Sequence, residues 1–266
     1  MLIDTHAHLY LDQYSDDLDA VLERAREAGV QKIIMPAIDV PSIHRAIELC
    51  HAHEGLYAMA ALHPTATKEA SDEDFARVAD LCEDPHIVAV GETGLDYYWD
   101  RSFDEKQRDF LRRHIRLAVE KDLPLVFHNR EAFEDLIVLV EEEKLASSTP
   151  ERLRGVFHCF TGTAEEAERV GKAGFLVGIG GILTFKNSRL SETVRDIPLQ
   201  QIVLETDSPY LAPAPFRGKR NEPAYVRFVA ERLVEVTGRP LNEVRLATTG
   251  NAERIFGLAQ FNRIER

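Results

Sequence analysis

The sequence predicts the α/β class and, within it, a single (β/α)8 TIM barrel that spans residues 1–266. Three observations support this prediction. Short apolar runs recur along the whole chain and alternate with segments of helical periodicity. Most of these runs are continuously apolar, as expected for parallel strands buried on both faces. The length of 266 residues is close to the roughly 250 residues typical of this barrel.

Eight apolar runs are predicted to form the strands. In chain order they are Leu2–His6, Ile33–Ile38, Leu56–His63, Ile87–Glu92, Leu123–His128, Val156–Phe160, Phe175–Ile179 and Ile202–Thr206. A doubly wound open sheet is the competing arrangement. It is disfavoured because no Gly-rich dinucleotide loop follows an early strand, and Gly178, Gly180 and Gly181 come only late in the chain.

Helical segments are predicted between the strands. The segment Asp16–Ala28 carries an apolar stripe that includes Leu18 and Leu22, and it stops at Gly29, a residue type common just after a helix. The same periodicity predicts helices at Phe103–Lys121, Ala132–Glu143, Ala164–Ala173, Ala224–Thr237 and Leu241–Phe256.

Composition limits the classes of function. Lys and Arg number 32 and Asp and Glu number 45, so the net charge is −13. An acidic chain has no bulk attraction for nucleic acid or membrane, although bound metals can supply positive charge locally. The cysteines Cys50, Cys82 and Cys159 are too few and too scattered for a disulfide framework and are predicted to be reduced. No signal peptide or membrane span is recognised, so a cytoplasmic protein is expected.

Side chains of metal-ligand type stand at several predicted strand ends. The C-terminal ends of the strands are where the active site of a (β/α)8 barrel lies. The candidates are His6, His8, Glu92, His128, His158 and Asp207. Their coincidence at strand ends is stronger evidence than any one of them.

The first two candidates are His6 and His8. They lie two residues apart, so on a strand they point to the same face with Cα atoms about 6.5–7 Å apart. Both imidazoles can therefore converge on one ion. The alternative is an ordinary polar strand end, and the matching residues on other strands favour the metal site.

The remaining candidates each have a plain structural alternative. Glu92 can bridge two cations through its two oxygens, or it can form a buried salt bridge. Asp207 can ligate one metal and accept a proton from water, or it can cap a helix before Ser208–Pro209. Taken alone, His128 and His158 could be satisfied core histidines.

Of the other histidines, His63 is predicted to face the substrate, because the pair His63–Pro64 ends the third strand. The rest are interpreted as surface or packing residues, namely His44, His51, His53, His86 and His114. No nucleophilic serine elbow is present.

Seven longer segments carry a family resemblance. They are IDTHAHL, GETGLDYYW, FHNREAFED, VFHCFTG, ETDSPYLAP, RGKRNEPAYV and TTGNAERIFGL, and they extend from residue 3 to 258. In this order they resemble the motifs of the TatD-type metal-dependent deoxyribonucleases, within the amidohydrolase-like barrels. One departure is Ala61, which stands two residues before His63–Pro64 where the family often has glycine.

The resemblance implies a two-metal phosphodiesterase site. His6, His8 and Asp207 correspond to ligands of one ion, His128 and His158 to ligands of the other, and Glu92 to the bridge. Positions near the substrate correspond to His63, Arg130, Arg217, Asn221 and Glu222. The loop after the eighth strand also carries Arg217, Lys219 and Arg220, whose charges suit a nucleic-acid backbone unless the loop is simply solvated.

The resemblance also implies a reaction and its partners. Two divalent cations about 3.5–4 Å apart can clamp a phosphodiester and lower the pKa of a bound water, with Asp207 as the general base and Glu92 between the ions. The family is described as Mg²⁺-dependent 3′→5′ exonucleases on DNA, some acting on RNA. Histidine ligands suit Zn²⁺ or Mn²⁺ better than Mg²⁺, so the metal is left open among these three. No membrane and no obligate protein partner is expected.

Two other functions are weighed. The same site could hydrolyse a carboxylic ester or amide, as in a D-aminoacyl-tRNA deacylase. Related amide hydrolases often bridge their metals through a carboxylated lysine, whereas the fourth strand here ends in Glu92, which favours the nuclease. A catalytically dead barrel acting as a binding module would lack ligands, and all six are present.

Overall fold

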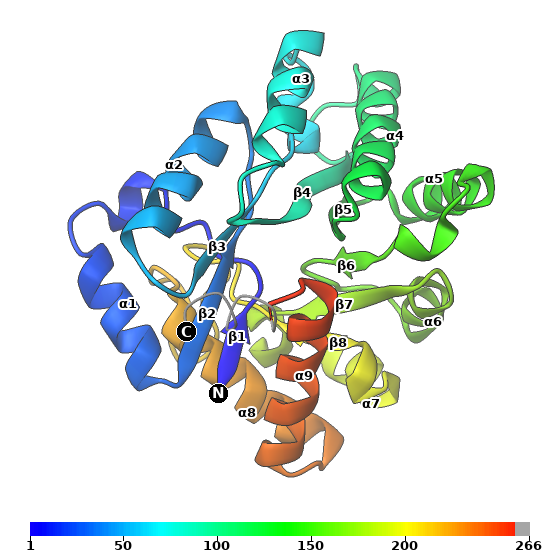
Figure 1. Ribbon diagram of the computed structural model, residues 1–266. Coiled ribbons are helices and arrows are strands. Elements are labelled where there is room, and N and C mark those ends of the chain that lie inside the picture. Colours follow the sequence, from blue (N-terminus) through cyan, green and yellow to red (C-terminus); the bar gives the residue numbers. More distant parts are fainter. Residues whose placement is uncertain (259–266) are drawn as a thin grey trace. The chain divides into compact units, whose positions relative to one another are not determined.

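The computed structural model describes residues 1–258. Its eight strands follow one another in the sheet order β1-β2-β3-β4-β5-β6-β7-β8. Strands and helices alternate along the chain, as Figure 1 shows. This arrangement confirms the predicted (β/α)8 fold class. Among the described residues, no helix combines the length and the apolar character that crossing a bilayer requires.

The strands and helices have the following bounds. The strands are β1 (Leu2–Asp4), β2 (Val30–Met35), β3 (Leu56–Met59), β4 (Ile87–Asp96), β5 (Leu125–Arg130), β6 (Gly155–Phe157), β7 (Phe175–Ile179) and β8 (Ile202–Leu204). The helices are α1 (Leu18–Glu27), α2 (Val40–Ala52), α3 (Asp72–Leu81), α4 (Asp104–Lys121), α5 (Phe133–Ala146), α6 (Ala164–Lys172), α7 (Leu190–Asp196), α8 (Val226–Thr237) and α9 (Leu241–Ile255).

The chain forms two compact units, each described by itself. Within the described residues, unit 1 comprises Met1–Met35, Cys159–Lys172 and 176–258, and unit 2 comprises Pro36–His158 and Ala173–Phe175. The single domain expected over residues 1–266 stays a prediction.

In unit 1 the first and last strands are neighbours. β1 pairs in parallel with β2, and β7 pairs in parallel with β8. The Thr5 N–H donates to the Leu204 carbonyl at 3.0 Å, and the Asp207 N–H donates to the His6 carbonyl at 2.8 Å. Helices α8 and α9 pack on β1 and β8. The C-terminal ends of β1 and β8 therefore lie side by side.

In unit 2 the strands β3 to β6 form a parallel array. The rings of Phe127 on β5 and Phe157 on β6 lie 5.2 Å apart, and Phe133 of α5 lies 6.3 Å from Phe157. These two strand phenylalanines thus belong to the layer that faces the helices. Because successive side chains of a strand alternate, His128 and His158 point away from this layer.

The observed elements differ from the predicted ones in two respects. β4 continues to Asp96, four residues beyond the predicted end at Glu92. Three helices were not predicted, namely α2, α3 and α7. For α2 the sequence held a signal, because Asp39 and Ser42 form a capping box at its start. A second capping box, between Ser71 and Asp74, begins α3.

All three cysteines are free thiols, as predicted. Cys50 and Cys82 are buried, and burial raises the pKa of each thiol to about 12. They act as small core residues, whereas Cys159 is partly exposed.

Candidate metal centre

Unit 1 brings together the three residues assigned by resemblance to one ion. The Nε2 atom of His8 lies 3.5 Å from Asp207 Oδ1, and that of His6 lies 3.8 Å from the same oxygen. The two imidazoles meet edge to face, with centroids 5.2 Å apart. One ligand atom from each of the three residues lies within 4.8 Å of the others. Two imidazoles and a carboxylate therefore converge as metal ligands do.

A buried carboxyl holds the strand ends under this group. Asp4 accepts hydrogen bonds from the backbone N–H of His6 at 3.2 Å and of Thr206 at 2.9 Å. It also accepts the Thr206 hydroxyl at 2.6 Å. Burial raises the pKa of Asp4 to about 8 against the opposing effect of these bonds. Asp4 thus ties the backbone before His6 to the backbone before Asp207.

Asp207 itself has an unusual backbone. Its φ is +55°, in the left-handed region that residues other than glycine seldom adopt. Such conformations cost free energy and collect at functional sites, where the surrounding structure maintains them. Here the Asp207 N–H bond to His6 and the adjacent bridge between Ala7 and Ser208 fix that conformation.

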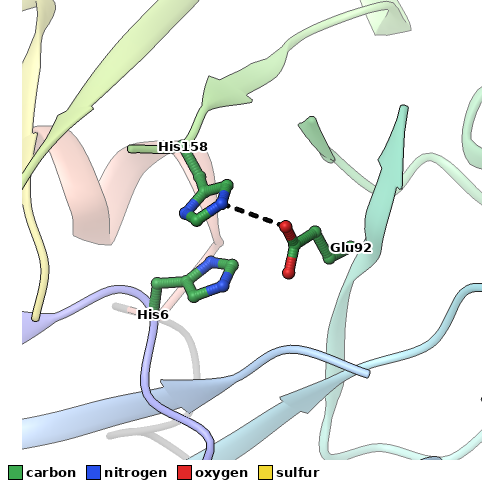
Figure 2. Close-up of side chains that lie close together, drawn as sticks. All are labelled: His6, Glu92 and His158. Atoms are coloured by element: carbon green, nitrogen blue, oxygen red, sulfur yellow. Dashed lines mark ion pairs between the residues drawn. The ribbon is translucent and has the colours of Figure 1, made fainter. Parts of the chain in front are cut away.

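Unit 2 gathers three histidines around Glu92. Glu92 Oε1 lies 2.8 Å from His128 Nδ1, 3.0 Å from His158 Nε2 and 3.5 Å from His63 Nε2. Figure 2 shows His158 and Glu92 turned toward each other. The carboxyl is buried, so its interactions with the three imidazoles are weakly screened.

A β-bulge places Glu92 in this position. Val90 pairs with Leu125 and Gly91 with Val126, but the next pair is Thr93 with Phe127, so Glu92 is the extra residue. A bulge bends the strand locally and can turn a side chain toward a site, which is why bulges are frequent beside active sites. Strand β4 therefore delivers Glu92 from its middle and not from its end.

Three histidines share one pattern of contacts. Each has one ring nitrogen held by a neighbouring group and the other directed at a carboxylate. His8 Nδ1 lies 2.8 Å from the Tyr10 hydroxyl, and His63 Nδ1 lies 2.7 Å from the Thr65 hydroxyl. His128 Nε2 lies 2.9 Å from Asp96 Oδ2. Metal-ligating histidines are oriented in this way, so the residues present fit bound divalent cations.

The pair of His128 and Asp96 also affects protonation. Burial lowers the pKa of His128, but the hydrogen bonds to Asp96 and Glu92 outweigh it and the net shift is upward. Burial likewise raises the pKa of Asp96, and the His128 bond together with backbone N–H groups brings the net shift downward. Asp96 is therefore a carboxylate that accepts a hydrogen bond from the imidazole.

The six predicted ligands lie in these two groups. His63 stands within the Glu92 group, and its expected contact with substrate stays a prediction. Sequence reasoning missed Asp4, Tyr10 and Asp96. Asp4 had a signal, because it precedes His6 by two residues and so shares its face of the strand.

The predicted substrate contacts have other partners in the structure. The Arg130 guanidinium lies 3.8 Å above the Tyr98 ring, and that of Arg217 lies 3.5 Å above the Phe185 ring. Asn221 is buried and donates its amide to the Thr206 and Tyr210 carbonyls. Glu222 Oε2 accepts a hydrogen bond from Arg24 Nη2 at 2.6 Å. Asn221 and Glu222 thus hold the loop in place, and contact with substrate stays a prediction.

The fold and the two groups of imidazoles and carboxylates define a class, the metal-dependent hydrolases built on a (β/α)8 fold. Comparison with known proteins gives the family. The model of the TatD related DNase family matches residues 3–257, so the chain belongs to that family.

Individual relatives agree. YabD of Bacillus subtilis, an uncharacterized metal-dependent hydrolase, is 42% identical over 96% of this chain and 99% of its own length. YcfH of Escherichia coli K12, also an uncharacterized metal-dependent hydrolase, is 35% identical over 96% of this chain and 95% of its own. The crystal structure of YjjV, a TatD homologue from Escherichia coli K12, superposes with a TM-score of 0.90 at 32% identity, covering 96% and 98% of the two chains. The chain is therefore a TatD-family metal-dependent hydrolase.

Proposed function

We propose that this hydrolase is a deoxyribonuclease that removes nucleotides from DNA in the 3′→5′ direction at a two-metal site. The observation that carries the proposal is the anchoring of His8, His63 and His128, each by one ring nitrogen, while the other nitrogen faces a carboxylate. Family membership supports the nuclease over other hydrolases.

The ligands are assigned in two sets. His6, His8 and Asp207 would hold one ion, and His128 and His158 would hold the other. Glu92 would contribute its carboxylate to both sets, because a carboxylate has two oxygens that can act as ligands. His63 stands close enough to Glu92 to join the second set.

The chain's own residues then have separate tasks. When bound, the two cations would polarise the phosphodiester and make water a stronger nucleophile. Asp207 would accept the proton of the attacking water, because its carboxylate stands at the edge of its group and is partly exposed. Tyr10, Thr65 and Asp96 would keep the imidazoles in the required orientation.

Charge explains why the cations matter for substrate. The chain carries a net charge of −13, which repels a polyanion. Bound divalent ions would reverse the sign locally, and the exposed Arg217 and Lys219 add positive charge on the loop after β8. The large share of imidazole in the donor sets favours Zn²⁺ or Mn²⁺ over Mg²⁺.

The test is product analysis on 5′-end-labelled DNA with Mg²⁺, Mn²⁺ or Zn²⁺ added. A 3′→5′ exonuclease gives a ladder that shortens one nucleotide at a time, whereas an endonuclease gives internal fragments at once. His158→Ala should slow the ladder roughly 10- to 100-fold or more, and His44→Ala, which removes an exposed histidine of α2, should leave its rate unchanged. A preparation that leaves DNA intact with all three metals yet deacylates D-aminoacyl-tRNA would establish the ester hydrolase instead.

A further inference from the structure

The turn after β4 exposes two aromatic side chains beside the Glu92 group. Tyr98 is 49% exposed and Trp99 is 68% exposed. Their rings meet edge to face with centroids 4.8 Å apart. Folding usually hides indole and phenol rings, and an exposed aromatic patch next to a polar site indicates binding.

This turn is held firmly and is linked to a metal-type histidine. Asp96 Oδ1 accepts the backbone N–H of Tyr98 at 3.0 Å and of Trp99 at 3.4 Å, while Oδ2 lies 2.9 Å from His128 Nε2. Gln107 of α4 exchanges two hydrogen bonds with the Asp96 backbone, at 2.8 and 2.9 Å. One carboxylate therefore sets the position of the exposed rings relative to His128.

A cation covers part of the aromatic pair. The Arg130 guanidinium lies 3.8 Å from the Tyr98 ring centroid and 5.1 Å from that of Trp99. Arg130 is two residues beyond His128 on the same strand. A guanidinium fixed on aromatic rings keeps donors for a phosphate while its flat face is stacked.

Trp99 also forms one wall of a cavity of about 360 Å³, lined by Thr65, Lys68, Asp96, Trp99, Asp100 and Phe103. Thr65 contacts His63 and Asp96 contacts His128, so the cavity adjoins the Glu92 group on two sides. Lys68 pairs with Asp100 at 2.8 Å, which largely neutralises its charge. The cavity therefore suits a flat, uncharged ring better than a phosphate.

We propose that Trp99 and its cavity form a nucleobase subsite, in which the indole stacks on an unpaired base of the nucleic-acid substrate while Arg130 faces the adjoining backbone. The proposal rests on the proposed nuclease function and adds a residue-level reason for choosing a nucleic acid. Stacking on aromatic side chains tolerates any base, because every base has a π face. It requires that the base be out of a duplex, as at a frayed or single-stranded end.

The chain's single tryptophan allows a direct test. Full-length protein loaded with metal is titrated with phosphorothioate-linked oligothymidylate, which resists hydrolysis, and Trp99 emission is followed. A strand of the same length and charge built from abasic units is the matched probe. Saturable quenching by the thymidylate strand alone is expected. Equal quenching by both strands, or none by either, would overturn the proposal.

Variants provide the second measurement. Trp99→Leu should raise KM for single-stranded DNA roughly 5- to 100-fold, the range of one lost stacking contact, and should remove the preference for base-bearing over abasic strands. Leu145→Ala removes another exposed apolar side chain, on α5, and should leave both values unchanged. If Trp99→Leu keeps the wild-type preference, the subsite is wrong even when DNA is cleaved. If the wild type is quenched by thymidylate but cleaves no DNA, the nuclease proposal fails and the subsite stands.

Discussion

His128 and Asp96 are joined by a contact of 2.9 Å between Nε2 and Oδ2, and this leaves His128 Nδ1 facing Glu92 at 2.8 Å. Asp96 is almost fully buried and uses its second oxygen to hold the backbone of Tyr98. One carboxylate thus orients an imidazole on one side and an exposed aromatic turn on the other.

Asp96→Asn should weaken metal binding without unfolding the protein. The amide keeps an oxygen for the Tyr98 N–H but loses the charge that orients His128, and such supporting contacts are worth roughly 10- to 100-fold in metal affinity. Competition of each protein with a chelating dye measures that affinity. Asp80→Asn, an exposed carboxyl on α3, is the control. Equal affinities in the two variants would assign Asp96 to loop structure only.

Glu92→Ala should remove most activity and lower the metal content, because it deletes the carboxylate shared by His63, His128 and His158. The fold should survive, since Glu92 is the extra residue of a bulge and not part of the regular ladder. Metal analysis and circular dichroism measure the two effects. A variant with wild-type rate and stoichiometry would show that Glu92 is not a ligand.

His128→Ala and His158→Ala should weaken the same metal site. Both imidazoles contact the same Glu92 oxygen, so each deletion removes one ligand of a small set. Activity and affinity should fall roughly 10- to 100-fold or more. The double variant should lose little beyond the single ones, because residues that act as a unit are not additive. Full metal loading in both single variants would make them core histidines.

Removing a positive charge from the loop after β8 should weaken the salt dependence of DNA binding at Arg217 and Lys219 but not at Arg220. Arg217 and Lys219 are exposed, whereas Arg220 pairs with Asp17 at 2.7 Å and donates to the Gln13 carbonyl. Each lost phosphate contact lowers the slope of log affinity against log salt by about 0.7 for single strands. We expect this for Arg217→Ala and Lys219→Ala, with the metal content unchanged. For Arg220→Ala we expect lower stability and an unchanged slope; slopes identical to wild type in all three variants would exclude the loop from the binding surface.

Because of His114, the free energy of unfolding should decrease as the pH is lowered. Burial lowers the pKa of His114 from 6.5 to about 4, while Nδ1 donates to Phe110 and Nε2 accepts from Leu62. At pH values between these two pKa values, His114 is protonated in the unfolded chain but not in the folded chain. The free energy of unfolding therefore decreases as the pH falls. The loss from this residue is about 2 kcal/mol by pH 5. Denaturant titrations at pH 7.5 and 5 should show a smaller decrease for His114→Gln, and equal decreases would refute the assignment.

The strand ends were predictable because chemistry and hydrophobicity coincide there. His6, His128 and His158 each follow an apolar run, and the fold brings such positions to one end of the sheet. The bulge at Glu92 was not predicted, although Gly91 directly before it is a residue type that often marks a bulge within a strand. Nor was the pairing of Arg220 with Asp17, because nothing local connects residues 203 positions apart.

Separation along the sequence also distinguishes the Glu92 group from the group of His6, His8 and Asp207. Every member of the Glu92 group lies between His63 and His158, so all of its side chains are available once residue 158 has left the ribosome. His6 and His8 are made first but must wait for Asp207, and Asp4 must wait for Thr206, 202 residues later. During synthesis the side chains of the Glu92 group are therefore all present before those of the His6 and His8 group, which is complete only after Asp207 has emerged.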